Sequence, residues 1–374
     1  MYVLVANAGS SSLKMRLLDS TDRVLAALDL GQWAGRHETE EIEHFVGALD
    51  RVDAVGHRIV HGGTTFHGPT VIDADVRDRI AALGELAPLH QPRGVAGIDT
   101  ISQVLPDVAA VACFDTAFHH QLPNVAATYA LPRTWIERWG LRRYGFHGLS
   151  HAYASRRAAE LLGRDAAGLR IVSCHLGAGA SLAAVDGGHS VDTTMGFTPL
   201  EGLVMATRAG SIDPGLLLWL LRHAKMSVEA LSDTLEHNSG LAGLAGGSGD
   251  MRQVCRDAAA GRPDAVRAFE VYVHRLRREI AAMAAAMDGL DVLIFTGGVG
   301  EHQPLVRAAA AAGLGFLGVG VAEAANTAAT TDADITSPSA HVRTLVITAR
   351  EDTEIARQTR AVLRGESGPT MRPR

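Results

Sequence analysis

The sequence predicts an α/β protein made of two similar domains with an active-site cleft between them. Apolar, strand-like segments alternate with helical patterns in both halves, as is typical of α/β folds. A unit of strand, glycine turn and strand also occurs in each half. At 374 residues the chain is long enough for two domains of ordinary size. We expect the first at 1–148 and the second at 149–374, with a final helix at about 352–364 packing back on the first.

The individual elements follow from hydrophobic spacing and from turn residues. In the first half we expect strands at 2–6, 12–18, 24–30, 54–60 and 108–114, helices at 38–49, 75–86 and 94–104, and then a loop-rich stretch at 115–148. In the second half we expect helices at 149–162, 263–287, from about 303 and at 352–364, and strands at 169–175, 180–186, 291–298 and 344–348. The apolar stripe of helix 263–287 predicts core or subunit packing.

The two strand–turn–strand units are similar enough to suggest an internal duplication. "VLVANAGSSSLKMRLLD" at 3–19 and "IVSCHLGAGASLAAVD" at 171–186 each contain an apolar strand, a polar residue, a Gly/Ser turn, a second strand and a closing Asp. The polar residue is Asn7 in the first and His175 in the second. The alternative, that any two glycine-turn hairpins look alike, stays open on this comparison alone.

Composition excludes several classes of protein. The formal net charge is −6 without a long basic run, which argues against a nucleic-acid or anionic-membrane partner. The three cysteines lack metal-ligand spacing and are expected to be reduced. No signal-peptide pattern begins the sequence, and no apolar run approaches the ~20 residues of a membrane span. We therefore expect a cytoplasmic protein.

Three glycine-rich turns follow apolar strands and predict phosphate binding. They are "NAGSSSLK" at 7–14, "HLGAGAS" at 175–181 and "FTGGVGE" at 295–301. Glycine lets backbone N–H groups approach phosphate oxygens, and serine hydroxyls add donors. Lys14 adds a positive charge. No GK[ST] follows the first turn, so it is not a P-loop.

These turns, taken with other segments, resemble a known family. "NAGSSSLK", "GHRIVHGG", "FDTAFH", "RRYGFHGLSH", "HLGAGAS", "MGFTPLEGL", "ATRAGSIDPG" and "FTGGVGE" occur in the order of the motifs of acetate kinases. These belong to the acetate and sugar kinase/Hsp70/actin superfamily. The resemblance, from residue 3 to about 358, implies two domains of actin-like, ribonuclease H-like βββαβαβα type. It also implies a homodimer, for which helix 263–287 is one candidate contact.

The resemblance assigns four catalytic residues. Arg58 and Arg208 would bind the carboxylate and the transferring phosphoryl group, and His147 would hydrogen-bond that group in the transition state. Asp115 would be the catalytic aspartate. A small carboxylic acid, with a pKa of about 4.3, is already ionised at neutral pH, so we interpret Asp115 as a positioning group or a ligand to metal-bound water. In a sugar kinase it would be a true base.

The resemblance also implies the remaining ligands. Asn7 and Glu351 match the metal ligands, and both offer the hard oxygens that Mg²⁺ prefers, with Mn²⁺ as the alternative. A pocket for the alkyl end of acetate would be lined by Val60, Leu89, Phe146 and Pro199. The nucleotide would contact Lys14, His175, Leu176, Gly177, Ala178, Gly179, Asp250, Met251, Arg252, Gly298, Val299, Gly300, Glu301 and His302. The expected reaction is ATP + acetate ⇌ ADP + acetyl phosphate.

Three departures from the family pattern all affect the nucleotide and metal side. Ala178 replaces an asparagine, His302 follows Glu301 where an asparagine is usual, and Arg350 replaces the asparagine before Glu351. The phosphoryl donor is therefore open, and so is the choice between acetate and propionate, because one methylene changes binding by only ~1–3 kcal/mol. More distant alternatives are a sugar or polyol kinase and an actin- or Hsp70-like nucleotide-binding module.

Overall fold

The computed structural model describes residues 1–9, 12–31, 33, 39–88 and 90–366. The chain forms two units, and each is described by itself. Unit 1 comprises Met1–His120, Phe146–Tyr153 and Arg350–Arg374, and unit 2 comprises Gln121–Gly145 and Ala154–Ala349. Both units are α/β. The domain boundary expected at residue 148 stays a prediction.

Unit 1 is built on a mixed sheet with the strand order β3-β2-β1-β4-β6-β5. Strands β1, β4 and β6 are parallel, and β2 is antiparallel to β1. The strands are β1 (Val3–Ala8), β2 (Leu13–Leu18), β3 (Val24–Leu30), β4 (Ala54–Ile59), β5 (Thr70–Val71) and β6 (Ala110–Phe114). The helices are α1 (Thr39–Gly47), α2 (Ala74–Ala82), α3 (Gln91–Val104) and α15 (Glu351–Leu363), with the short 3-10 turns 83–86 and 117–119.

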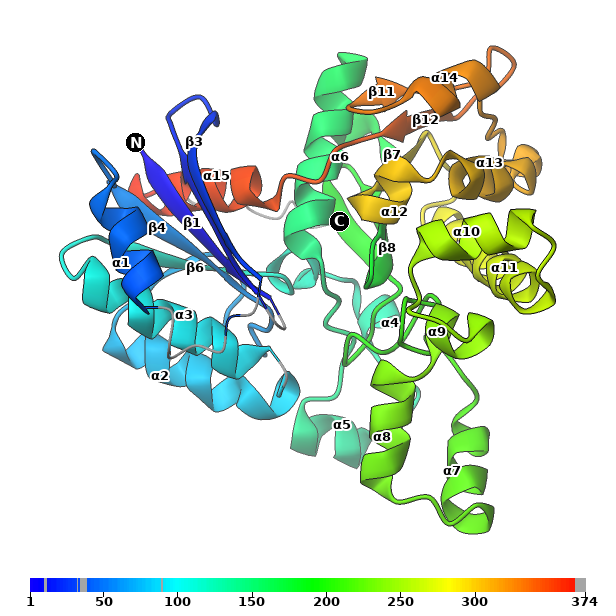
Figure 1. The fold of residues 1–374 in the computed structure, drawn as a ribbon, viewed down its shortest axis with the longest axis horizontal. Helices are drawn as coiled ribbons and strands as arrows, with labels where there is room; N and C mark the ends of the chain where they lie inside the picture. The colour runs from blue at the N-terminus through cyan, green and yellow to red at the C-terminus, as the bar shows by residue number, and fades with distance from the viewer. Residues whose placement is uncertain (10–11, 32, 34–38, 89, 367–374) are drawn as a thin grey trace. The chain divides into compact units, whose positions relative to one another are not determined.

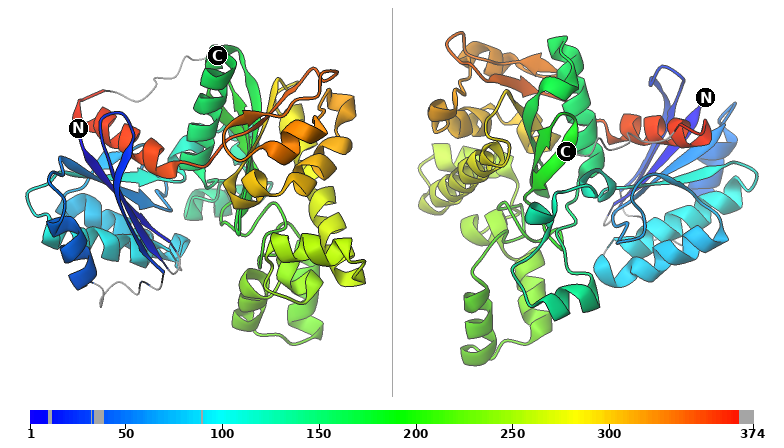
Figure 2. Two further views of the ribbon diagram at one scale, coloured as in Figure 1. Left: turned by 45° about the horizontal axis from the view of Figure 1, so that its top comes forward. Right: turned by 180° about the vertical axis from the view of Figure 1, so that it is seen from behind.

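The alternation of side chains along β1 divides the core of unit 1 into two layers. Leu4, Ala6 and Ala8 pack on the side of α1 and α3. Val3 and Val5 point to the other face and pack against Ile355 and Ala356 of α15. Figures 1 and 2 show α15 on the face of this sheet opposite to α1–α3. The C-terminal helix therefore completes the core of unit 1.

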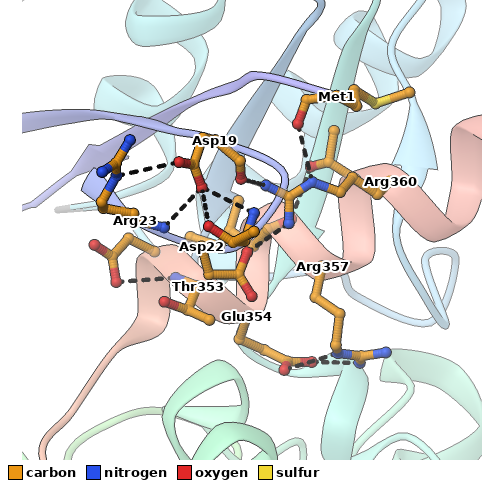
Figure 3. Close-up of polar contacts among 12 residues, drawn as sticks. Met1, Asp19, Asp22, Arg23, Thr353, Glu354, Arg357 and Arg360 are labelled. Atoms are coloured by element: carbon orange, nitrogen blue, oxygen red, sulfur yellow. Dashed lines mark hydrogen bonds and ion pairs between the residues drawn. The ribbon is translucent and has the colours of Figure 1, made fainter. Parts of the chain in front are cut away.

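Close contact and a buried guanidinium fix α15 on this face. A Cβ on Gly56 of β4 would lie 2.5 Å from Thr359 Oγ1, so only glycine lets the helix approach this closely. Arg360 donates to the carbonyl oxygens of Met1 (3.2 Å) and Asp19 (2.6 Å) and to the Asp22 carboxylate (2.5 Å). Figure 3 shows this guanidinium lying between the N-terminus and the β2–β3 turn.

Unit 2 repeats the strand order, β9-β8-β7-β10-β12-β11, with β7, β10 and β12 parallel. The strands are β7 (Arg170–Leu176), β8 (Ala180–Asp186), β9 (His189–Thr193), β10 (Val292–Thr296), β11 (Ala333–Asp334) and β12 (Arg343–Val346). The helices are α4 (Asn124–Ala127), α5 (Arg133–Trp139), α7 (Pro214–His223), α8 (Val228–His237), α9 (Gly240–Ala245), α10 (Met251–Ala259), α11 (Pro263–Ala285), α12 (Gly297–His302), α13 (Pro304–Ala312) and α14 (Glu323–Ala328), while α6 (Gly148–Leu162) begins in unit 1 and ends in unit 2.

The long helix α11 supplies much of the core of unit 2. It packs against β7 and β8 and against α9, α10 and α13. Most of the apolar stripe predicted for helix 263–287 is buried here, including Val273, Leu276 and Ile280. The predicted core packing is therefore confirmed for most of the stripe, while Val266 and Phe269 are only partly buried, and a subunit contact by this helix stays a prediction.

Two stretches differ from the sequence-based expectations. The segment 115–148, expected to be loop-rich, contains α4 and α5. Both are at most two turns long, so they lack the repeated apolar spacing that identifies a helix. The segment after β10, expected as a glycine turn, begins the helix α12 directly after Gly297, whose φ of 77° lets the chain turn sharply.

Candidate active site

Polar side chains collect where the central parallel strands of unit 1 end. Asn7 of β1 is in register with Arg58 of β4, and Asp115 directly follows β6. Glu351 begins α15. Because Asn7 shares the sheet face of Val3 and Val5, it projects on the side that α15 covers. The same topology that builds the core therefore brings these four residues together.

Arg58 lies at the centre of this cluster. Its Nε and Nη2 donate to the two oxygens of Asp115 at 3.1 and 2.6 Å, a bidentate pair. Its Nη1 donates to Asn7 Oδ1 at 3.1 Å, and its Nε lies 3.8 Å from Glu351 Oε2. The side chains of Arg58 and Asp115 are only 16% and 2% exposed. The guanidinium is thus held rigidly in one orientation.

Burial and charge act in opposite directions on this pair. Burial raises the pKa of Asp115, while the adjacent Arg58 charge lowers it and Glu351 adds a further upward shift. Burial also lowers the pKa of Arg58, but Asp115 and Glu351 outweigh this and raise it above its ordinary value. Arg58 is therefore a permanent cation, whose charge is shared between two carboxylates.

Lys14 lies in register with Asn7 on the neighbouring strand β2. Cross-strand partners in an antiparallel pair point to the same face, so Lys14 projects from the same face as the cluster. Its side chain is exposed. This arrangement leaves a second cation available to a ligand at the end of the sheet.

Phe146 and His147, two more of the predicted site residues, lie in the segment 146–148 of unit 1. Phe146 is 1% exposed, and its ring meets His61 edge-to-face at a centroid distance of 5.5 Å. His147 adopts a φ of 56°, which is uncommon for a residue with a side chain and recurs at functional sites. The next residue, Gly148, donates to the carbonyl oxygen of Asp115 at 2.9 Å. Val60 is also buried, whereas Leu89 lies outside the described residues.

Pro199 and Arg208 belong to unit 2. Arg208 Nη1 donates a long hydrogen bond of 3.4 Å to the carbonyl oxygen of Pro199 and lies 4.0 Å from Met205 Sδ. Burial lowers the pKa of its guanidinium, and Glu236 opposes this shift. Within the described part of the chain, Arg208 makes no ion pair. Among the described residues it is thus a half-buried cation that no carboxylate contacts directly, in contrast to Arg58.

The predicted nucleotide residues at 175–179 comprise the end of β7 and the turn that leads into β8. His175 pairs in register with Ser181 of β8 and with Thr296 of β10. Leu176 is buried, and the Gly177 N–H donates to the Gly179 carbonyl at 2.9 Å. The side chain of Ala178 is exposed. The turn is thus a tight hairpin whose tip presents no side-chain donor.

The predicted adenosine residues 298–302 all lie in α12. Glu301 Oε1 accepts from the N–H of Ala349 at 2.9 Å, which fixes the end of this helix to the segment after β12. The fully buried Arg307 donates to the carbonyls of Gly300 and Glu301 at 2.8 and 2.6 Å. Burial lowers the pKa of Arg307 to about 10.

The third nucleotide segment, 250–252, is the start of α10. Asp250 caps this helix by accepting from the backbone N–H of Arg252, and the two side chains pair at 2.7 Å. This contact lowers the pKa of Asp250. Met251 is buried in the core, so its side chain serves packing. Its role as a nucleotide contact stays a prediction.

The oxygen donors of unit 1 fit a magnesium ion that is bound mainly by a substrate. No group of three or more His, Cys, Asp and Glu that could enclose a metal occurs among the described residues. Asn7 Nδ2 lies 3.4 Å from Glu351 Oε2, so an amide and a carboxylate stand side by side. Mg²⁺ is commonly held by one or two carboxylates together with phosphates and water. Asn7 and Glu351 could hold it in this way.

Comparison with known proteins decides the family. The model of the acetokinase family matches residues 36–357, most of the chain. The chain belongs to the acetokinase family. An acetate kinase of Nostoc sp. is 48% identical over 399 aligned residues, covering 96% of this chain and 98% of that protein. One of Nostoc punctiforme is 49% identical over 319 residues, covering 85% and 78%.

Solved structures of the acetokinase family have the same fold. The crystal structure of Porphyromonas gingivalis acetate kinase superposes with a TM-score of 0.89 at 35% identity and covers 97% of this chain and 99% of that one. A propionate kinase from Francisella tularensis gives the same TM-score and identity, covering 96% and 99%. The predicted actin-like α/β fold is thereby confirmed, and the chain is a phosphotransferase with a carboxyl group as acceptor. The acetokinase family generally uses a divalent metal with ATP.

The sequence-based reasoning did not single out the residues that hold these segments in place. Arg143 and Glu201 lie within "RRYGFHG" and "MGFTPLEGL", two motifs used for the resemblance, yet neither side chain was considered. They form an ion pair of 2.9 Å in unit 2. A charged residue inside a motif is the signal that could have identified them.

No described helix is long and apolar enough to cross a bilayer.

Proposed function

We propose that the chain catalyses the reversible, Mg²⁺-dependent transfer of the γ-phosphoryl group of ATP to acetate, giving ADP and acetyl phosphate. The observation that carries this proposal is the rigid Asn7–Arg58–Asp115–Glu351 cluster in unit 1. Acetate, ATP and the transferred group are all anionic, so the reaction needs fixed cations more than a base. Arg58 meets this need.

Asp115 fits the role of a positioning group. Both of its oxygens accept hydrogen bonds from Arg58, and its side chain is almost fully buried. Acetate is ionised at neutral pH and brings no proton that must be removed. Asp115 would therefore orient the guanidinium toward the reacting oxygens. A sugar kinase, in contrast, would need this carboxylate free to accept a proton.

Arg208, His147 and the residues of the alkyl pocket complete the proposed carboxylate site. Arg208 makes no ion pair within the described chain, so its charge is available to a phosphoryl oxygen. The positive φ of His147 supports a functional role for its imidazole as a donor to that oxygen. Val60, Phe146 and Pro199 would contact the methyl group, as Leu89 would by resemblance. Such a small pocket selects by size.

The nucleotide would bind to residues of unit 2 together with Lys14. The turn 175–179, the segment 250–252 and the helix residues 298–302 supply backbone N–H groups and polar side chains. Asn7 and Glu351 would hold Mg²⁺ together with the nucleotide phosphates, where the ion would supply positive charge to the transferring group. Mn²⁺ offers the same coordination and is the alternative ion.

A hydroxamate assay for acyl phosphate tests the proposed function. The purified protein is incubated with acetate, propionate or butyrate, each with ATP, GTP or pyrophosphate and MgCl₂. We expect acetyl hydroxamate to form with ATP, and little product to form with butyrate. A protein that forms no acyl phosphate from any acid and donor would contradict the proposal.

Two alternatives are distinguished by the same assay, and a third by a separate measurement of ADP release. The similarity to the Francisella propionate kinase supports a measurement of kcat/KM for acetate and for propionate. A higher value for propionate would show that propionate is the preferred substrate. Product formed only with pyrophosphate would show that pyrophosphate is the phosphoryl donor. The departures from the family pattern at Ala178, His302 and Arg350 could require such a change. Sugar- or glycerol-dependent release of ADP would instead indicate a sugar or polyol kinase.

A cytoplasmic homodimer is also part of the proposal. Helix α11, whose Val266 and Phe269 are only partly buried, is one candidate contact, and α7 is a second. Leu216, Leu218 and Trp219 of α7 are each about half exposed, at 46%, 51% and 52%. Light scattering on a sizing column would give the mass. A monomer at micromolar concentration would contradict this part alone.

A further inference from the structure

We propose that Tyr129, Arg143 and Glu201 form a clamp that positions the loop at 194–202 and thereby sets the affinity for the carboxylate substrate. The inference rests on the proposed function, because this loop carries Pro199 and contacts Arg208. All three residues belong to unit 2.

Arg143 connects the two ends of the loop. Its Nη1 donates to the carbonyl oxygens of Thr194 and Met195 at 3.3 and 3.1 Å. Its Nη2 donates to Glu201 Oε1 at 2.9 Å. The Arg143 and Glu201 side chains are 18% and 34% exposed, so the pair is largely shielded from water. A single guanidinium therefore holds the first and the last part of the loop together.

Tyr129 holds the middle of the loop. Its hydroxyl donates to Glu201 Oε2 at 2.6 Å and accepts from the N–H of Phe197 at 2.8 Å. Burial and the contact with Glu201 raise the pKa of Tyr129, which keeps the hydroxyl protonated as a donor. The Arg143 guanidinium lies 5.6 Å from the centre of the Tyr129 ring. Each member of the clamp thus contacts the other two.

Gly196 gives an independent indication that the clamp is closely packed. A Cβ at this position would lie 1.7 Å from Glu201 Oε2 and 2.2 Å from the Tyr129 hydroxyl. The φ of Gly196 is not positive, so space and not backbone conformation requires glycine here. The carbonyl of Gly196 also accepts from the N–H of Tyr144 at 3.1 Å.

The clamp is connected to substrate binding through Pro199. This residue lies between Phe197 and Glu201, the two points that Tyr129 holds. Its carbonyl oxygen accepts from Arg208 Nη1. If the loop relaxes, Pro199 and the Arg208 contact move together, whereas the nucleotide residues at 298–302 are held separately by Arg307 and Ala349. Loss of the clamp should therefore affect the carboxylate more than ATP.

Three variants test this inference: Tyr129→Phe, Glu201→Gln and Gly196→Ala. We expect each to raise the KM for acetate about tenfold, with the KM for ATP changed less than about twofold. Amide hydrogen exchange of residues 194–203 in the protein without substrate should become faster, most clearly at Phe197 in Tyr129→Phe. Glu201→Gln keeps the shape and one acceptor, so it should fold even if Gly196→Ala does not.

Two matched controls come from the same unit. Glu137→Gln removes the acid of an exposed ion pair with Arg133, and Gly168→Ala adds a methyl group where no atom lies within 4 Å. Neither should change the acetate KM or the exchange of residues 194–203. An unchanged acetate KM in the clamp variants, or equal increases for acetate and ATP, would overturn the inference and leave the proposed function intact. Wild-type protein without activity on any acid would overturn both.

Discussion

The two sheets of this protein have the same strand order but carry different chemistry at equivalent positions. In unit 1, Asn7 of β1 lies in register with Arg58 of β4, and in unit 2 the corresponding pair is His175 of β7 with Thr296 of β10. Arg58 is held by two carboxylates and an amide, whereas the Thr296 hydroxyl is buried with no partner among the described residues. A shared topology thus positions side chains, and the residue types decide which ligand each unit can bind.

The segments that leave the equivalent strands differ as well. After β4 the chain continues as an irregular segment through Val60 and Gly63, while after β10 it enters α12 at once through Gly297. Unit 1 therefore presents fixed charges and a small apolar surface, and unit 2 presents backbone groups of a turn and a short helix. We propose that the fixed charges of unit 1 act on the carboxylate, with Arg208 and Pro199 of unit 2, and that the turn and helix of unit 2 bind the nucleotide, with Lys14 of unit 1. The predictions below test this assignment.

The largest expected effect concerns the two arginines. We expect Arg58→Ala and Arg208→Ala each to lower kcat/KM by about a thousandfold, because each removes a positive charge that would stabilise the transferring phosphoryl group. Their stabilities should differ. Arg58→Ala leaves Asp115 buried without its partner and should cost about 3–5 kcal/mol, whereas Arg208→Ala breaks no ion pair and should change the free energy of unfolding by less than about 1 kcal/mol.

Activity assays and urea unfolding measure both effects. Glu137→Gln, which removes an exposed pair, serves as the control for both. Full activity in either arginine variant would remove that residue from the site, and equal destabilisation would show that Arg208 has a structural partner.

An intermediate effect is expected on the stability of unit 1 as the pH falls. Burial lowers the pKa of His57 from its ordinary 6.5 to about 4, and its Nε2 has no partner within the described chain. Between these values the unfolded chain binds a proton that the folded chain does not. The contribution of His57 to the free energy of unfolding is therefore complete above pH 6.5 and is lost as the pH falls to about 4. The loss amounts to about 3 kcal/mol.

Urea unfolding between pH 7 and 4 measures this dependence. His57→Leu should reduce the slope below pH 6.5. An unchanged slope in this variant would assign the pH dependence to two further buried histidines of unit 1, His61 and His119, whose pKa values burial also lowers to about 4.

The smallest effect concerns the turn between β7 and β8. Ala178 is exposed at its tip, and the usual family residue there is asparagine. Ala178→Asn adds an amide donor near the proposed nucleotide phosphates and should lower the KM for ATP by up to about tenfold, with the KM for acetate unchanged. Steady-state kinetics with each substrate varied in turn measures the change. A lower KM for acetate and not for ATP would contradict the assignment of this turn to the nucleotide.

The regular core elements could be predicted from the sequence because they follow simple spacing rules. The strand at 180–186 and the alternating strands of unit 1 agree with the structure. The helices at 214–245, α7 to α9, have no counterpart among the sequence-based predictions. α7 buries no residue fully, so it lacks the apolar periodicity on which such a prediction depends.

The candidate site was predictable only to the level of the motifs. The juxtaposition of Asn7, Arg58, Asp115 and Glu351 depends on strand register and on α15, which no local pattern reveals. The clamp of Tyr129 with Glu201 joins residues 72 positions apart, and the hydroxyl of a lone tyrosine gives no signal in a sequence.

The place of α15 has a consequence for biosynthesis. One face of the first sheet is covered by a helix that follows the whole of unit 2 in the chain, and Arg360 joins that helix to the carbonyl of Met1. A nascent chain that emerges from its N-terminus would expose Val3 and Val5 until the last helix leaves the ribosome. Glu351 begins this helix, so under the proposed function the metal site also stays incomplete until α15 has been made.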